Sequence, residues 1–115
     1  MQSKLRILFV CGRNQWRSPT AAQIYRNDPR LEVRSAGVSS KSRHPLSAAD
    51  LEWADLVLVM EQEYKVHIQK QFARLSLPKI ENLEIPDEYE YMHPELVDLL
   101  RQAVEARLAL INAQD

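Results

Sequence analysis

Cysteine and glycine are scarce in this sequence of 115 residues, which has one cysteine, Cys11, and two glycines. A lone cysteine excludes an internal disulfide and a zinc site built from several thiolates. Because there are so few glycines and no low-complexity run, nothing indicates a flexible linker between two domains. We therefore expect a single domain over residues 1–115.

An excess of charge of one sign and long apolar runs are also missing. The formal net charge is −1, which leaves no polybasic field for binding nucleic acid or a membrane surface. No apolar run approaches the roughly 18 residues of a membrane span. Residues 1–6 lack the basic region, apolar stretch and cleavage site of a signal peptide. The expectation is a cytoplasmic protein with no nucleic-acid or membrane partner, and the oligomeric state stays open.

Signs of a metal or a cofactor are absent from the sequence as well. The three histidines, His44, His67 and His93, follow no metal-binding spacing. We interpret them as structural or solvated side chains and expect no metal site. A glycine-rich dinucleotide fingerprint and a phosphate loop ending in Gly-Lys-Ser/Thr are both missing, so we expect no cofactor.

Apolar patterning alternates strands with helices along the chain. Strands are predicted at residues 5–10, 31–35, 55–60 and 79–85, the last with the weakest alternation. Helices are predicted to begin at Ser18-Pro19, at Ser47 with a capping-box pattern, around Tyr64, Ile68, Phe72 and Leu75, and at Pro94. This order predicts an α/β fold, a three-layer α/β/α arrangement around a four-stranded parallel sheet. We expect the strands of this sheet in the order 2-1-3-4.

The loop after the first predicted strand is the most informative part of the sequence. It reads Cys11-Gly12-Arg13-Asn14-Gln15-Trp16-Arg17-Ser18, and Pro19 follows. Unpaired N–H groups at a strand-to-helix junction, together with the helix dipole, can bind a tetrahedral dianion. Helix N-termini and cations also favour the thiolate form of a cysteine, which is the nucleophilic form. The planar fork of Arg17 could hold two oxygens of the same phosphate.

Several residues of this loop also have a plainer interpretation. Cys11 could be a small buried apolar residue, and Ser18 could be a helix cap, a hydrogen-bond donor to the thiolate, or both. Asn14 suits a left-handed kink that braces the loop, or a solvated turn. Arg13 could add a second cation at the rim or point to solvent. Trp16 could form a pocket wall or pack on a neighbouring helix.

The segments Leu8-Phe9-Val10-Cys11 and Arg17-Ser18-Pro19-Thr20-Ala21-Ala22 resemble the low-molecular-weight protein tyrosine phosphatase family. The signature of that family is a Cys-x5-Arg-Ser-Pro loop after the first strand. Further similar segments follow in the family's order: Ser35-Ala36-Gly37, residues 54–60 and Ile85-Pro86-Asp87-Glu88-Tyr89. The resemblance, to a compact bacterial-type branch, implies hydrolysis of phosphate monoesters, phosphotyrosine foremost, through a cysteinyl-phosphate.

The resemblance also implies a role for each matching residue. Cys11 would be the nucleophile, Arg17 the phosphate clamp, and Asp87 the general acid that later acts as a base. Backbone amides of Gly12, Arg13, Asn14, Gln15, Trp16 and Arg17 would cradle the phosphate. Asn14, Ser18 and Ser35 would form a supporting hydrogen-bond shell, and Tyr89 would line the pocket mouth beside Trp16. A phosphorylated protein or a small aryl phosphate would be the partner.

The sequence departs from the family pattern at several positions. Arg13 stands where the family has glycine, Trp16 where it has a second cysteine, and Glu88 follows Asp87 where it has proline. The stretch after Gly37 lacks the segment that supplies a supporting histidine. From the residues alone, Asp87 is equally well explained as a turn former. A phosphate-binding module without turnover, and arsenate reduction with a thiol supplied by another molecule, therefore remain as alternative hypotheses.

Overall fold

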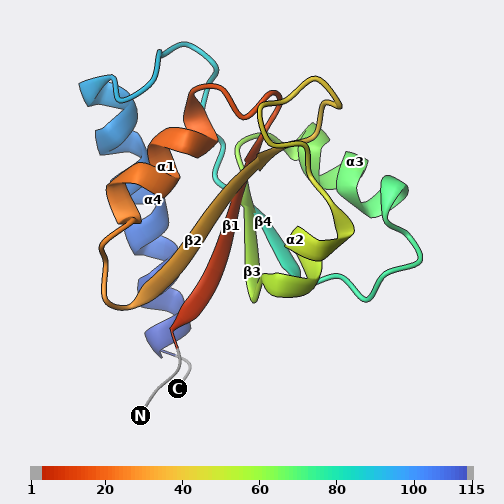
Figure 1. The fold of residues 1–115 in the computed structure, drawn as a ribbon. Helices are drawn as coiled ribbons and strands as arrows, with labels where there is room; N and C mark the ends of the chain where they lie inside the picture. Colours follow the sequence, from red (N-terminus) through yellow and green to blue (C-terminus); the bar gives the residue numbers. More distant parts are fainter. Residues whose placement is uncertain (1–3, 114–115) are drawn as a thin grey trace.

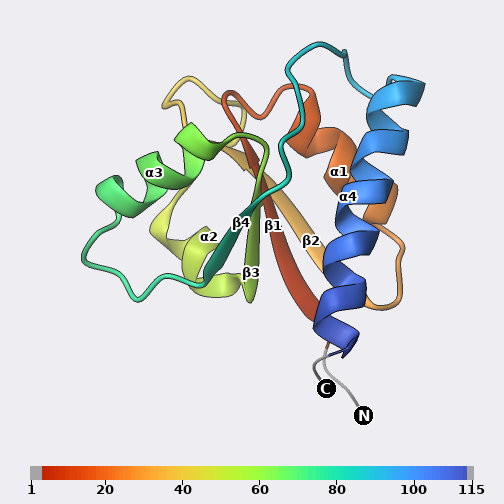
Figure 2. The same ribbon diagram turned by 180° about the vertical axis from the view of Figure 1, so that it is seen from behind.

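A computed structural model describes residues 4–113 as one four-stranded parallel sheet with helices on both faces (Figures 1 and 2). The strands are β1 (Leu5–Cys11), β2 (Leu31–Gly37), β3 (Leu56–Val59) and β4 (Lys79–Asn82). The helices are α1 (Arg17–Tyr25), α2 (Ala48–Trp53), α3 (Gln62–Gln71) and α4 (Pro94–Ala113). The strand order is β2-β1-β3-β4, which confirms the predicted topology.

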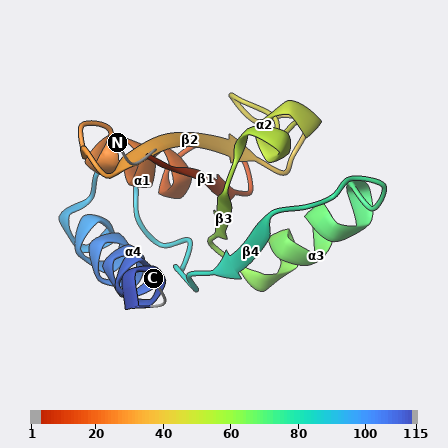
Figure 3. The same cartoon turned by 90° about the horizontal axis from the view of Figure 1, so that it is seen from below.

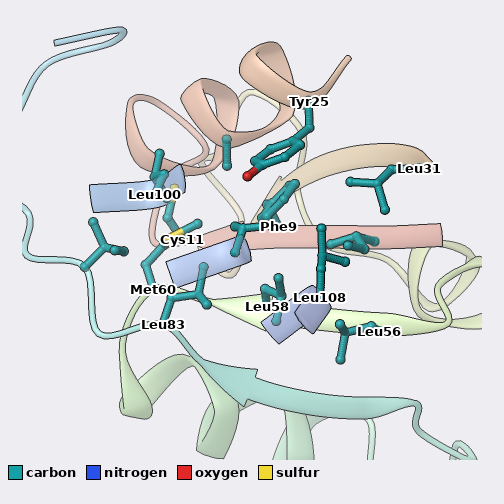
Figure 4. Packing of buried hydrophobic residues seen from close by; sticks show 14 of the residues in the cluster. Phe9, Cys11, Tyr25, Leu31, Leu56, Leu58, Met60, Leu83, Leu100 and Leu108 are labelled. Atoms are coloured by element: carbon teal, nitrogen blue, oxygen red, sulfur yellow. The ribbon is translucent and has the colours of Figure 1, made fainter. Parts of the chain in front are cut away.

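Helices α1 and α4 cover one face of the sheet, and α2 and α3 cover the other (Figure 3). Successive side chains of β1 alternate between these two layers, so Phe9 packs toward α1 and α4 while Val10 packs toward α2 and α3. Figure 4 shows Cys11 at the end of the first of these layers, beside Met60 and Leu100. The long apolar run of β1 is explained by burial on both faces, as parallel strands require.

The ends of β1, β2 and β3 lie within two residues of the predicted ends, and two larger or more informative differences concern the end of β4 and the start of α1. Strand β4 ends at Asn82, because Glu84 adopts a left-handed φ of 56° that turns the chain. Leu83 and Ile85 are nevertheless buried, and their amides donate to the carbonyls of Val59 and Met60. The predicted strand over residues 79–85 is therefore observed only as far as Asn82, but the alternation of Leu83 and Ile85 corresponds to burial of both side chains.

The start of α1 also differs. This helix begins at Arg17, and its N-cap position, Trp16, makes no side-chain cap hydrogen bond. Ser18 lies inside the first turn, so its predicted role as helix cap is wrong. The capping box of α2 is confirmed, since Ser47 and Asp50 exchange both of its hydrogen bonds.

The carboxyl ends of the strands bring several loops together at one end of the sheet (Figure 1). The amides of Val38 and Ser39 donate to the carbonyls of Cys11 and Gly12, at 3.0 and 2.9 Å. Residues 37–46 are thereby held against the loop after β1. No helix among residues 4–113 has the length and apolar character needed to cross a bilayer.

Candidate active site

Cys11 is the last residue of β1, and its sulfur is held by a serine from the next helix. The Sγ of Cys11 lies 2.9 Å from the Oγ of Ser18, and both residues are almost fully buried. The Ser18 hydroxyl is also 2.9 Å from the Oδ1 of Asn14 and 3.3 Å from the carbonyl of Ala36. Because a hydroxyl has one proton and can rotate, Ser18 can donate to an ionised sulfur or to Asn14.

The shape of the loop depends on Asn14 and Gly37. Asn14 is buried with a φ of 52°, the left-handed conformation expected from its residue type. A Cβ on Gly37 would lie 2.7 Å from the backbone nitrogen of Asn14 and 2.1 Å from the Oγ of Ser42. Only glycine therefore permits this approach. Ser42 in turn donates from its hydroxyl to the carbonyl of Gly12 at 3.2 Å.

Arg17 is buried, with 2% of its surface exposed, and its guanidinium is fixed from several sides. Nη1 donates to Glu61 Oε2 at 2.7 Å and to the carbonyl of Ile85 at 2.8 Å. Nη2 donates to the hydroxyl of Tyr64 at 2.9 Å, and Nε lies 3.6 Å from Asp87 Oδ1. Burial lowers the pKa of Arg17, but the bond to Glu61 and the other acidic neighbours outweigh it and raise the pKa. The side chain is therefore a permanent cation.

These side chains enclose one cavity of about 250 Å³ above the end of β1. Its lining residues are Cys11, Gly12, Arg13, Gln15, Trp16, Arg17, Tyr64 and Asp87. The structure thus brings Asp87, the predicted acid, to the same cavity as Cys11 and Arg17, the predicted nucleophile and clamp, although Asp87 is far from both in the sequence. Trp16 stands at the wall of this cavity, and its ring is partly exposed.

Two predicted site residues lie elsewhere. Ser35 pairs with Phe9 in the sheet, two positions before Cys11, and lines a separate hollow beside Pro19. Its hydroxyl makes no hydrogen bond to Asn14 or Ser18 within residues 4–113, whereas Ser42 supports the loop through its bond to the carbonyl of Gly12.

Tyr89 is the second of these residues. Its ring centroid lies 5.1 Å from that of His93, and it packs against the core cluster beneath α4. The loop that carries it turns again at Met92, which has a φ of 61°. Tyr64 takes the aromatic position at the cavity for which Tyr89 was predicted.

Glu61 and Tyr64 were missed by sequence reasoning. Glu61 is the second residue after β3, at the sheet edge where ligands bind, so a carboxylate there was a usable signal. Tyr64 gave no separate signal, because it fits the apolar stripe of α3 as well.

Among residues 4–113, no three His, Cys, Asp or Glu side chains gather closely enough to hold a metal ion.

Comparison with known proteins gives matches among solved structures. The YwlE arginine phosphatase from Geobacillus stearothermophilus is 26% identical, with 94% of this chain and 96% of that chain covered and a TM-score of 0.67. YfkJ from Bacillus subtilis is 20% identical, with 99% and 98% covered and a TM-score of 0.70. The tyrosine phosphatase Wzb from Escherichia coli K30, in complex with phosphate, is 22% identical, with 90% and 96% covered and a TM-score of 0.69. No family model and no curated protein match.

The fold and the Cys-x5-Arg loop group this chain with solved structures that are named phosphatases, among them the YwlE arginine phosphatase at 26% identity. The predicted resemblance to the low-molecular-weight protein tyrosine phosphatases is confirmed, since structures of that kind match over nearly the whole chain.

Proposed function

We propose that the protein hydrolyses phosphate monoesters, phosphotyrosine foremost, through a covalent cysteinyl-phosphate on Cys11. One observation carries this proposal: the Cys11 sulfur, the Arg17 guanidinium and the Asp87 carboxylate line the same cavity. A nucleophile, an anion clamp and a proton donor are the groups that phosphoryl transfer through a cysteine requires.

Phosphate binding follows from the donors that Arg17 leaves free. A guanidinium has five N–H groups, and three of those of Arg17 are engaged by Glu61, Ile85 and Tyr64. The Nε–H, whose nitrogen lies 3.6 Å from Asp87 Oδ1, and one Nη2–H make no hydrogen bond to residues 4–113. They remain for two phosphate oxygens, a bidentate arrangement that fixes position as well as charge. Backbone N–H groups of the loop between Gly12 and Arg17 would bind the remaining oxygens.

The reaction would proceed in two displacements at phosphorus. In the first, the Cys11 thiolate forms an S–P bond, the P–O bond to the leaving group breaks, and protonated Asp87 gives its proton to the departing oxygen. In the second, the Asp87 carboxylate takes a proton from water, which attacks phosphorus and breaks the S–P bond. The sulfur leaves as a thiolate, and the Ser18 hydroxyl, 2.9 Å away, would stabilise it.

The walls of the cavity support an aromatic phosphate as substrate. Trp16 and Tyr64 line the same cavity as Cys11, and aromatic side chains pair well with an aryl ring. A phosphorylated protein or a small aryl phosphate would therefore fit. Because the mechanism needs a reduced thiol, we propose the reducing cytoplasm as its place of action.

Phosphoarginine is a second candidate substrate. The carboxylate of Asp87 stands at the cavity and is 59% exposed, so it could also bind the guanidinium of a substrate. The neighbour that is 26% identical is named an arginine phosphatase. The same thiolate would then break a P–N bond, and Asp87 would protonate nitrogen.

Hydrolysis of an aryl phosphate, a phosphotyrosine peptide and a phosphoarginine peptide by the wild type and by Cys11→Ser and Arg17→Lys tests this function. We expect turnover by the wild type, none by Cys11→Ser, and a loss of 100-fold or more, roughly, in Arg17→Lys. Activity that survives Cys11→Ser would reject the proposal. Tight phosphopeptide binding without hydrolysis between about pH 5 and about pH 8 would favour a binding module instead. Arsenate-dependent oxidation of thioredoxin or glutathione would favour arsenate reduction.

A further inference from the structure

Tyr64 connects the phosphate clamp to the loop that would hold the phosphate. It lies in the first turn of α3, is half-buried, and packs against both core layers. Its hydroxyl is 2.9 Å from Arg17 Nη2 and 2.9 Å from Glu61 Oε2. A Cβ built on Gly12 would lie 3.0 Å from the same hydroxyl. The hydroxyl oxygen of Tyr64 thus lies close to Arg17, to Glu61 and to the loop at Gly12.

The direction of these hydrogen bonds is fixed by the groups that take part. A carboxylate only accepts, so the Tyr64 hydroxyl donates its single proton to Glu61. A guanidinium only donates, so the lone pair of the same hydroxyl accepts from Arg17 Nη2. Burial raises the pKa of Tyr64 to about 12, which keeps this proton in place across the working range of pH.

Arg17, Glu61 and Tyr64 therefore form a closed ring of hydrogen bonds. Nη1 donates to Glu61 Oε2, and Nη2 donates to Tyr64 Oη. These two oxygens lie 2.9 Å apart and are joined by the hydrogen bond from Tyr64 to Glu61. This arrangement occupies the end of the guanidinium that carries both Nη atoms. Ile85 accepts the second Nη1–H. The side of the guanidinium formed by Nε and Nη2 makes no other hydrogen bond to residues 4–113, although Asp87 Oδ1 lies 3.6 Å from Nε, and this side is what remains for a ligand.

We propose that Tyr64 is a positioning residue, which turns the free side of the Arg17 guanidinium toward the phosphate above Cys11. This inference rests on the proposed function, because it concerns the clamp of that same site. Glu61 alone could neutralise Arg17 from several orientations. The second acceptor from Tyr64 selects one orientation, since two parallel hydrogen bonds fix the plane of a guanidinium.

Gly12 is the loop residue that lies opposite the Tyr64 hydroxyl. A methyl group at position 12 would lie within 3.0 Å of the Tyr64 hydroxyl but at ordinary contact distances, 3.6 and 3.8 Å, from two ring carbons. Glycine at this position therefore makes room for the hydroxyl in particular. The effects of substitutions at positions 12 and 64 should therefore be non-additive.

The test compares Tyr64→Phe with the wild type, and uses Tyr91→Phe, an exposed tyrosine outside the cavity, as matched control. We expect Tyr64→Phe to lower kcat/KM for an aryl phosphate about tenfold, with a similar loss of vanadate affinity and little change in thermal unfolding. In an Arg17→Lys background, the same change should have less than about a twofold effect, because Tyr64 acts through Arg17. Gly12→Ala should impair the wild type more than it impairs Tyr64→Phe.

NMR spectra of the Arg17 guanidinium separate this proposal from the proposed function. We expect distinct, slowly exchanging Nη–H signals in the wild type and averaged signals in Tyr64→Phe, whether or not the protein turns over a substrate. A wild type without hydrolysis but with this NMR difference would reject the proposed function and keep the positioning role. Unchanged Arg17 signals with unchanged kcat/KM and vanadate affinity in Tyr64→Phe would overturn the positioning role.

Discussion

The Sγ of Cys11 and the Oγ of Ser18 lie 2.9 Å apart in a buried contact between the end of β1 and the first turn of α1. This places a hydroxyl donor directly on the sulfur that would attack phosphorus and later leave it. Both steps involve a thiolate, and a charge-assisted hydrogen bond stabilises a thiolate more than a neutral thiol. The pair therefore links the packing of α1 against β1 to reactivity.

Ser18→Ala removes that donor without leaving a large cavity. We expect the rate of Cys11 alkylation by iodoacetamide at neutral pH to fall several-fold, and kcat to fall about tenfold. Thr20→Ser, which keeps a hydroxyl in the same helix turn, is the control and should leave both rates close to the wild type. Equal alkylation rates in Ser18→Ala and the wild type would contradict a role of Ser18 at the sulfur.

Asp87→Asn tests the proton donor. General acid catalysis contributes about 100-fold to 10,000-fold, so we expect a loss of about that size with phosphotyrosine. A substrate whose leaving group needs no protonation, such as a nitrophenyl phosphate, should lose much less in the first step. The control is Glu88→Gln, the exposed carboxylate next in sequence. A loss that is the same for good and poor leaving groups would argue against Asp87 as the acid.

Glu61→Gln should change how stability depends on pH. Burial raises the pKa of Glu61, but hydrogen bonds from Arg17 and Tyr64 outweigh it and hold that pKa below the ordinary value. A lowered carboxyl pKa stabilises the fold above the ordinary value of about 4.3, and this stabilisation is lost as pH falls through the folded-state pKa.

The variant should therefore be less stable than the wild type at neutral pH, by about 1 kcal/mol or less, because solvent screens a carboxylate whose side chain is 38% exposed. The difference should shrink below about pH 4, as measured by urea unfolding. Glu63→Gln, an exposed change in the first turn of α3 two residues after Glu61, serves as the control. A difference between Glu61→Gln and the wild type that stays constant from neutral to acid pH would refute the linkage.

Gly37→Ala should damage fold and site together. The added methyl group would meet the backbone of Arg13 and Asn14 at 2.8 and 2.7 Å, as well as the Ser42 hydroxyl. We expect a loss of about 1 to 3 kcal/mol in the free energy of unfolding and a marked loss of kcat, measured by chemical denaturation and hydrolysis. Adding Ser42→Ala should recover only part of the loss, because the backbone contacts remain. Full recovery would show that Ser42 alone causes the conflict.

The parallel sheet could be predicted from the sequence because local patterns indicate its strands and the helices between them. Continuous apolar runs in β1 and β3, followed by helix signals, are sufficient for a parallel sheet. The approach of Asp87 to the loop also followed from topology, since the carboxyl ends of parallel strands share one edge. Placement of Asp87 at the cavity agrees with that reasoning.

Which tyrosine would face the cavity could not be predicted in the same way. Tyr64 and Tyr89 both follow a strand and both suit a core or a pocket. The choice depends on the left-handed turns at Glu84 and Met92, which direct Tyr89 toward His93. The place of Ser35 could not be predicted for a related reason. Its position opposite Phe9 is set by the register between β2 and β1, which no local pattern in the sequence determines.

Trapping the covalent intermediate tests the central claim most directly. Asp87→Asn, mixed with a nitrophenyl phosphate and quenched rapidly in acid, should accumulate phosphate on the peptide that contains Cys11, as seen by mass spectrometry. The same treatment of the Cys11→Ser/Asp87→Asn double variant should release no nitrophenol and give no cysteinyl-phosphate. Turnover by the wild type without phosphate ever appearing on Cys11 would contradict the account.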